Sequence, residues 1–173
     1  MKKLLLALLL VCTLNVQGQC AADGEKKSLR MSIELGMQTS LRNKGMTMHG
    51  YHLDLGVVVY KHLSVLGGLD ILSHHLRQDG TKSYYNSVDL GGGLMYDFID
   101  KPSYSLPLKL KIGSTIGSPD WKHTFYDTSL SWNQLFGKSK VAGVLGIGYR
   151  YEKSRNDLMP SHGFVYFTAG IKL

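Results

Sequence analysis

The stretch SLRMSIELGMQTSL, residues 28–41, decides the fold. Apolar residues or Thr occupy its odd positions from 29 onward, and polar residues or Gly occupy its even positions. Side chains of an extended strand point alternately to opposite faces, so this pattern predicts a strand with one apolar and one polar face. The same alternation recurs to the last residue, which predicts an all-β protein.

The composition agrees with an all-β chain. A length of 173 residues suits one domain, and 43% hydrophobic with 19% charged residues is typical of neither a disordered chain nor a helical membrane protein. Twenty Gly against four Pro, with 10% aromatic residues, favour many strands that bend and pack closely.

The N-terminus has the form of a secretory signal peptide. Lys2 and Lys3 precede the apolar run 4–14, and small residues up to Gly18 form a cleavage site. The run is shorter than the ~20 residues that a membrane-spanning helix needs. The expected organisation is a signal peptide (1–18), a flexible lead-in (19–27) and a barrel domain (28–173).

Two cysteines bear on export and modification. Cys12 leaves with the signal peptide, so the exported chain keeps one thiol and forms no internal disulfide. Cys20 follows Gln19, whereas a lipobox places a small residue directly before the Cys. The pattern therefore favours an unlipidated N-terminus.

The net charge is mildly basic. Loss of Lys2 and Lys3 lowers the formal charge from +7 to +5, and the remaining basic residues are scattered along the chain. A nucleic-acid partner is recognised by a clustered basic stripe with interleaved aromatic residues. Scattered charge on an exported protein therefore excludes nucleic acid as a partner.

Seven further segments alternate as the first does. In one of them, Leu108, Leu110 and Ile112 alternate with Lys109 and Lys111, which indicates that one face meets hydrocarbon and the other is polar. The seven segments are 51–59, 65–72, 84–98, 106–113, 124–136, 141–152 and 165–173. Eight strands joined in sequence order predict a single antiparallel up-and-down transmembrane β-barrel.

The connections alternate in length, with longer polar loops after the odd-numbered strands. Outer-membrane barrels show this asymmetry, because their periplasmic turns are short and their outer loops are long. We therefore expect both termini to face the periplasm and the loops around Lys44, Asp79, Pro119 and Asp157 to face outward. Aromatic residues near strand ends fit the girdles of such barrels; they are Tyr51, Tyr84, Tyr96, Phe98, Tyr149 and Tyr151.

This pattern resembles the small eight-stranded outer-membrane barrels of the OmpA and OmpX type over residues 28–173. The family commonly ends in an aromatic residue, whereas this chain ends in Leu173 with Phe167 further in. The resemblance implies a monomeric bacterial outer-membrane protein, porin-like in form and exported across the Gram-negative cell envelope. Its implied partners are outer-membrane lipid, lipopolysaccharide and the barrel assembly machinery, and its implied roles are structural, adhesive or defensive.

Two alternatives to a scaffold barrel remain open. A few barrels of this size modify lipid A, which would make the protein an acyltransferase or deacylase. A soluble exported lipocalin-like barrel would reverse the faces and bind a ligand among apolar interior residues. The membrane barrel is favoured because the polar face holds many Gly and Ser with isolated charges of both signs, unlike a water-facing surface.

An enzyme would need a nucleophile, a base and an acid close together. Ser161 and His162 open the last strand and Glu152 closes the one before it, which makes these three the catalytic candidates. His74 and His75 are adjacent, so on a strand they point to opposite faces and make no site. The interpretation favoured for all five is that of solvated loop residues in a protein without enzymatic activity.

No cofactor or metal signature occurs in the sequence. Gly91, Gly92 and Gly93 lie inside a strand with no helix after them, so they indicate bending or close packing instead of a phosphate loop. A basic rim could contact lipopolysaccharide phosphates through charge-assisted hydrogen bonds. Its residues are Arg77, Lys82, Lys122, Lys153 and Arg155.

The inward faces carry charges of both signs. Counting back from the turns places Asp54 opposite about Asp70, and Asp70 opposite about Asp89, with Lys111 near the level of Asp89. Like charges directly opposite one another repel, so these carboxylates need cations. The interior charge network predicted from this pattern comprises Arg30, Glu34, Asp54, Asp70, Asp89, Lys109, Lys111 and Arg150. It predicts a plugged scaffold, because eight strands enclose just enough room for side chains. The alternative is a narrow channel in which these charges meet water.

Overall fold

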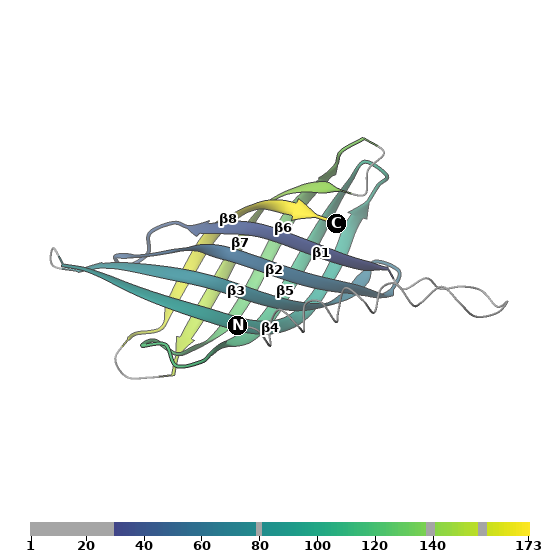
Figure 1. Cartoon of the computed structure of the whole chain (residues 1–173). Coiled ribbons are helices and arrows are strands. Elements are labelled where there is room, and N and C mark those ends of the chain that lie inside the picture. Colours follow the sequence, from purple (N-terminus) through teal and green to yellow (C-terminus); the bar gives the residue numbers. More distant parts are fainter. Residues whose placement is uncertain (1–29, 79–80, 138–140, 156–158) are drawn as a thin grey trace, which may run out of the picture.

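The computed structural model describes residues 30–78, 81–137, 141–155 and 159–173, which form a closed antiparallel barrel (Figure 1). Eight strands follow one another in sequence order around the wall, as predicted. They are β1 (Met31–Ser40), β2 (Met46–Tyr60), β3 (Leu63–Gln78), β4 (Thr81–Asp100), β5 (Tyr104–Ile116), β6 (His123–Leu135), β7 (Ala142–Ser154) and β8 (His162–Lys172). The predicted signal peptide and lead-in, with Cys12 and Cys20, lie outside the described residues.

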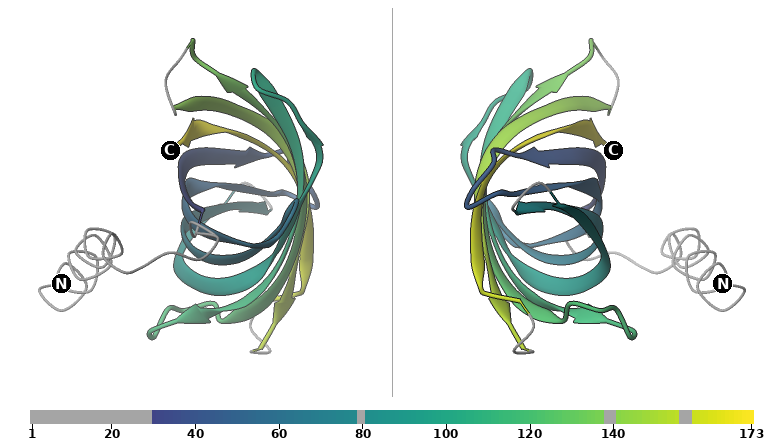
Figure 2. Two further views of the ribbon diagram at one scale, coloured as in Figure 1. Left: turned by 90° about the vertical axis from the view of Figure 1, so that its right-hand side faces the viewer. Right: turned by 90° about the vertical axis from the view of Figure 1, so that its left-hand side faces the viewer.

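The barrel closes where β8 pairs with β1. The antiparallel ladder there runs from Glu34 opposite Lys172 to Ser40 opposite Tyr166. Views turned toward the two ends of the barrel show the strands wrapping around an interior (Figure 2). Closure removes the free strand edges that an open sheet would expose.

The exterior of the wall is apolar along every strand. Large apolar side chains such as Leu35, Tyr51, Leu94, Leu110 and Leu145 are exposed, and their neighbours in sequence point inward. The alternation predicted for 124–136 is confirmed, since Thr128, Leu130 and Trp132 are exposed and Ser129 and Ser131 are buried. The wall therefore has the faces predicted for a membrane barrel, with apolar side chains outward and polar side chains inward.

The lipocalin alternative required an apolar interior, and this expectation is wrong. The buried side chains include Glu34, Asp54, Asp89, Lys109 and Arg150, each of which carries a formal charge. Charged side chains across the interior are unfavourable contacts for the apolar ligand that a lipocalin binds. In the described part of the chain no helix is long and apolar enough to cross a membrane.

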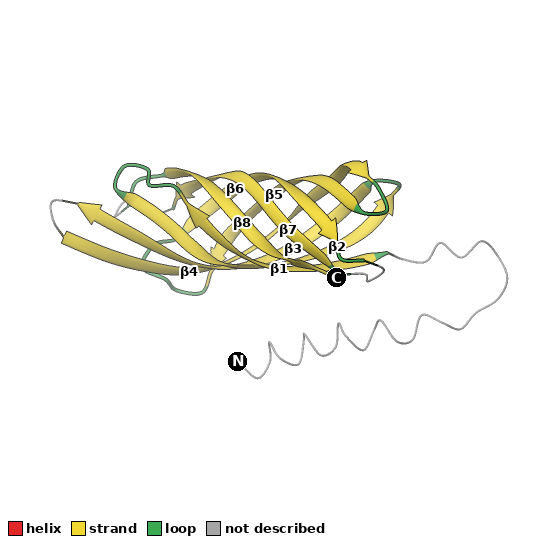
Figure 3. Ribbon diagram, turned by 90° about the horizontal axis from the view of Figure 1, so that it is seen from above, coloured by secondary structure: helices red, strands yellow, loops and turns green. Residues whose placement is uncertain are grey.

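The hairpin of β3 and β4 extends beyond its neighbours (Figures 1 and 3). The sequence predicts a loop over 73–83, whereas β3 continues to Gln78 and β4 begins at Thr81. Beyond Ile71 the outward residues of β3 are Ser73 and His75, so the apolar alternation disappears although the strand continues. The turn signal at Asp79 and Gly80 lies outside the described residues.

The connections differ less in length than the sequence predicts. The connection between β3 and β4 shortens to 79–80, and the connection between β6 and β7 spans 136–141. Between β1 and β2, Lys44 and Gly45 both have positive φ angles of 47° and 81°, as a type I′ hairpin turn requires. Strand extension at one end, more than loop length, therefore distinguishes the two ends of the barrel.

Candidate functional site

One cluster of charges fills the lumen between β1, β2 and β5. Lys109 Nζ donates hydrogen bonds to Glu34 Oε1 at 2.6 Å and to Asp54 Oδ2 at 3.0 Å. Lys111 Nζ donates to Asp54 Oδ1 at 3.0 Å, and His52 Nε2 lies 3.3 Å from Glu34 Oε1. All five side chains are buried, so each lysine ammonium neutralises carboxylates with little access to water.

A second cluster surrounds Arg150 on β7. Its guanidinium donates to Asp70 Oδ2 at 2.6 Å, to Glu152 Oε1 at 2.9 Å and to Asp89 Oδ2. Asp127 Oδ2 lies 3.7 Å away from the same group. The fork of guanidinium donors suits several carboxylates at once, and all five side chains are buried.

Two histidines complete the second cluster. His74 Nε2 on β3 lies 3.0 Å from Glu152 Oε2, and His123 Nε2 on β6 lies 2.9 Å from Asp89 Oδ2. Trp121 covers both rings, with ring centroids 4.8 Å from that of His74 and 4.7 Å from that of His123. The imidazoles are therefore held between carboxylates on one side and an apolar ring on the other.

The two clusters meet at Lys111, whose Nζ lies 3.7 Å from Asp70 Oδ1. Tyr166 donates a hydrogen bond of 2.8 Å to Asp127 Oδ1 and thereby attaches β8 to the network. The cavity between Glu34, Lys111 and Tyr166 has a volume of about 10 Å³. That volume is at the lower limit for one water molecule.

Apolar side chains lie over the end of the network that is nearest the hairpin of β3 and β4. They come from the start of β2, from β3 and β8, and from the connections that follow β5 and β7. The set comprises Met46, Met48, Leu72, Trp121, Met159, Phe164 and Tyr166. We call this set the apolar cap; its members are at most 8% exposed.

The register corrects the predicted order of the carboxylates. Asp70 does lie opposite Asp89, but Asp54 lies opposite Gly68, two residues from the predicted partner. A bulge between Val58 and Tyr60 shifts the ladder of β2 and β3. A Cβ atom at Gly68 would lie 2.8 Å from Asp54 Oδ1, so a larger residue there would have to displace this carboxylate.

Two other predictions about the charge network need correction. Lys111 lies opposite Gly93, four positions from the Thr115 that faces Asp89, and reaches Asp54 and Asp70 across the lumen instead. Arg30 lies before β1 with an exposed side chain, so it stands outside the buried clusters.

Sequence reasoning missed several members of the clusters. It did not assign the buried His52 and Asp127 to the network, and it interpreted His74 and Glu152, which are fully buried, as solvated loop residues. The sequence pattern did not indicate His123, because this residue precedes the alternating segment 124–136. If the alternation had been continued along β3 to its observed end at Gln78, it would have placed the His74 side chain inside the barrel.

The three catalytic candidates do not form a relay in the structure. Glu152 lies opposite His162 in the ladder, but its carboxylate contacts Arg150, His74 and His123. His162 Nδ1 lies 2.8 Å from the Pro160 carbonyl oxygen. Ser161 Oγ accepts a hydrogen bond from the Ser154 amide at 3.0 Å. Hydroxyl, imidazole and carboxylate thus have separate partners.

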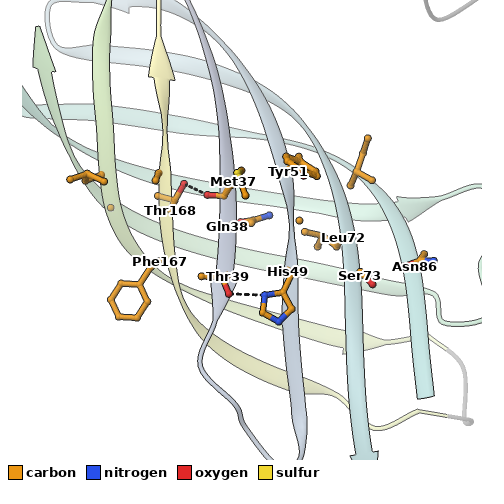
Figure 4. Close-up of a pocket in the computed structure, with 15 residues that line it drawn as sticks. Met37, Gln38, Thr39, His49, Tyr51, Leu72, Ser73, Asn86, Phe167 and Thr168 are labelled. Carbon is orange, nitrogen blue, oxygen red and sulfur yellow. Dashed lines mark hydrogen bonds between the residues drawn. The ribbon is translucent and has the colours of Figure 1, made fainter. Parts of the chain in front are cut away.

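A groove crosses the exterior of the wall near β1, β2, β3 and β8 (Figure 4). Its volume is about 770 Å³, and apolar residues such as Met37, Tyr51 and Phe167 line it. Polar side chains mark one edge, where Thr39 Oγ1 lies 2.7 Å from His49 Nδ1. The groove is therefore mainly apolar with a polar border.

A smaller polar pocket of about 220 Å³ follows beyond that border. Arg42, Arg77 and Lys82 supply its positive charge. It adjoins the groove through two rings, since His49 lines the groove, His75 lines the pocket and their centroids are 5.2 Å apart.

The predicted basic rim divides into two groups. Arg77 and Lys82 face each other across the hairpin of β3 and β4. The second group lies near the start of β6 and the end of β7 and comprises the exposed Lys122, Lys153 and Arg155. There the Arg155 amide donates to the Lys122 carbonyl oxygen at 2.8 Å. The first group borders the groove.

Comparisons with known proteins match the fold alone. No protein-family model and no curated protein matches the sequence. The crystal structure of Neisserial surface protein A matches with a TM-score of 0.53 and 14% identity, over 83% of this chain and 94% of that one. The Yersinia pestis outer membrane protein Ail, in a phospholipid bilayer nanodisc, matches with a TM-score of 0.50 and 14% identity, over 83% of this chain and 98% of that one. The chain therefore has the fold of the small eight-stranded outer-membrane barrels, the OmpA and OmpX type that its sequence resembles.

Proposed function

We propose that the protein spans the bacterial outer membrane as a closed barrel and acts as a structural and interaction scaffold that presents its outer loops. The observation that carries this proposal is an apolar exterior wrapped around an ion-paired interior. A soluble protein rarely exposes so large an apolar surface, because such surfaces associate in water. In a bilayer the same surface contacts hydrocarbon.

The scaffold role depends on a lumen that conducts no solute. Charged side chains from β1, β2, β5 and β7 meet across the lumen, and the apolar cap covers its outer end. Ion pairs that are hydrogen-bonded on several sides resist hydration, because opening a path would separate charges in a confined space. These contacts support a plug in place of a pore.

The proposed location is tested by fractionation and surface labelling. We expect the protein in the outer-membrane fraction, with an electrophoretic shift on heating in detergent. In a Cys20→Ala background, Lys44→Cys and Pro119→Cys should react with a membrane-impermeant thiol reagent on intact cells, because both loops face outward. Lys101→Cys, in the turn between β4 and β5, is the matched control and should stay unlabelled until the cells are opened. A soluble fraction, or the reverse labelling pattern, would contradict the proposal.

We also propose that the basic groups contact the phosphates of lipopolysaccharide. The polar pocket at Arg42, Arg77 and Lys82 follows directly on the apolar groove. A lipid with acyl chains and an anionic headgroup fits this sequence of surfaces, since guanidinium and ammonium groups donate strong hydrogen bonds to phosphate. Lys122, Lys153 and Arg155 form a second basic group at the same end of the barrel.

Charge reversal tests this contact. The double variant Arg77→Glu and Lys82→Glu should retain about tenfold less lipid A in native mass spectra of the folded barrel, corresponding to ~1.4 kcal/mol. Lys101→Glu, at the other end of the barrel, is the control and should retain as much as the wild type. Added salt should weaken retention by the wild type, because these charges are exposed. Equal retention by the two variants would show that this pocket does not select lipopolysaccharide.

A further inference from the structure

The buried carboxylates outnumber the buried permanent cations. In the described part of the chain, three buried side chains carry a permanent positive charge, namely Lys109, Lys111 and Arg150. Six buried side chains carry a carboxylate, namely Glu34, Asp54, Asp70, Asp89, Asp127 and Glu152. An interior with this imbalance needs further positive charge, because unpaired buried carboxylates are strongly unfavourable.

The imbalance lies at the outer end. Around Glu34 and Asp54, two lysine ammonium groups sit within 3.0 Å of the carboxylate oxygens. Around Asp89 and Glu152 the only permanent cation among the described contacts is Arg150, which Asp70 and Asp127 share. The remaining partners of Asp89 and Glu152 there are imidazoles, which carry charge only when protonated.

The geometry at the outer end suits a metal ion. One ligand atom each from Asp89, His123 and Glu152 lies within 4.8 Å of the others, and all three side chains are fully buried. His74 Nε2 is 3.0 Å from Glu152 Oε2 and offers a fourth donor. The four side chains come from β4, β6, β7 and β3, so the barrel wall fixes their positions.

Arg150 leaves carboxylate oxygen atoms available. It donates to Asp89 Oδ2 and Glu152 Oε1, the same oxygens that lie 2.9 Å and 3.5 Å from His123 Nε2, whereas Asp89 Oδ1 has no hydrogen-bond partner among the described residues. A cation that holds one oxygen of each carboxylate can orient the other toward a metal, as outer contacts of metal ligands do. Trp121, a member of the apolar cap, covers the two imidazoles of the site.

We propose that Asp89, His123, Glu152 and His74 bind one divalent transition-metal ion inside the barrel. Two imidazole nitrogens with two carboxylate oxygens form a ligand set that suits Zn²⁺ and its neighbours in the first row. The ion supplies the positive charge that the outer cluster lacks and ties four strands together. Since the site is enclosed, the ion enters as the barrel folds.

The test measures metal in the folded barrel. Wild-type protein is folded in detergent with Zn²⁺, and loosely bound zinc is then removed on a chelating resin. It should retain about one zinc ion per chain, measured by elemental analysis with mass spectrometry. His123→Gln should retain fewer than about one ion per ten chains. His52→Gln is the matched control, since His52 with Glu34 and Asp54 has the same ligand spacing. There two lysine ammonium groups already neutralise the carboxylates, so this variant should retain zinc as the wild type does.

The absorption spectrum of bound Co²⁺ gives a second readout of the site, in addition to the zinc content. Protein folded with Co²⁺ should show visible absorption bands of a tetrahedral site in the wild type and in His52→Gln, and not in the His74→Gln variant. A folded wild type without bound zinc and without cobalt bands would overturn the proposal. Loss of zinc from His52→Gln as complete as from His123→Gln would overturn it as well.

Discussion

Replacing Arg150 by Met is expected to lower the free energy of unfolding by about 3–5 kcal/mol, since the change leaves buried carboxylates without their cation. Arg150 is fully buried, and its guanidinium contacts Asp70, Asp89 and Glu152 and also lies 3.8 Å from the centroid of the Phe125 ring. No other arginine or lysine among the described contacts reaches Asp89. The measurement is a urea titration of the protein in phospholipid vesicles, in which the heat-dependent electrophoretic shift reports the folded fraction.

Arg30→Met is the matched control for this change. Arg30 was predicted to join the network, but its side chain is exposed before β1, so its loss should change the free energy of unfolding by less than about 0.5 kcal/mol. Arg150→Lys should fall between the two, because an ammonium group keeps the charge without the fork of donors. Equal effects of Arg150→Met and Arg30→Met would show that the buried pairs do not hold the barrel together.

The second large effect is expected on the outer face. Leu110 lies in the middle of β5, opposite Leu94 and Thr128, and 50% of its side chain is exposed. A charge at the bilayer midplane costs about 2–4 kcal/mol, so Leu110→Arg should destabilise the barrel by that amount in vesicles. The same urea titration measures it.

Thr81→Arg is the control for an added charge. Thr81 is exposed at the start of β4, beyond the apolar part of the wall, and arginine there should cost about 0–1 kcal/mol. Similar losses from Leu110→Arg and Thr81→Arg would mean that the exterior of β5 does not contact hydrocarbon.

The sequence allowed the wall to be predicted because each residue's face depends only on its parity. Leu110 and Lys111 are neighbours, yet one is half exposed and the other buried, as strict alternation demands. Parity fails where the environment of the outward face changes. Past Ile71 the strand leaves the apolar part of the wall, so Ser73 and His75 resemble a loop although they continue β3.

The pairing of the interior charges could not be predicted in the same way. Register between neighbouring strands depends on bulges, such as the one between Asp97 and Ile99, which leave no sequence signal. Contacts across the lumen also join strands that do not pair, as when Lys109 of β5 reaches Glu34 of β1. Such contacts follow from the tilt and closure of the barrel and from the length of the lysine side chain.

Planar-bilayer recording tests the central claim of a closed barrel most directly. The folded protein, purified with its heat-dependent shift intact, is reconstituted into a planar phospholipid bilayer, and current is recorded across a range of voltages. Because the ion-paired clusters and the apolar cap fill the lumen, we predict no steady single-channel conductance from the wild type. Reproducible, stable conductance steps from the folded wild-type protein would contradict the closed barrel.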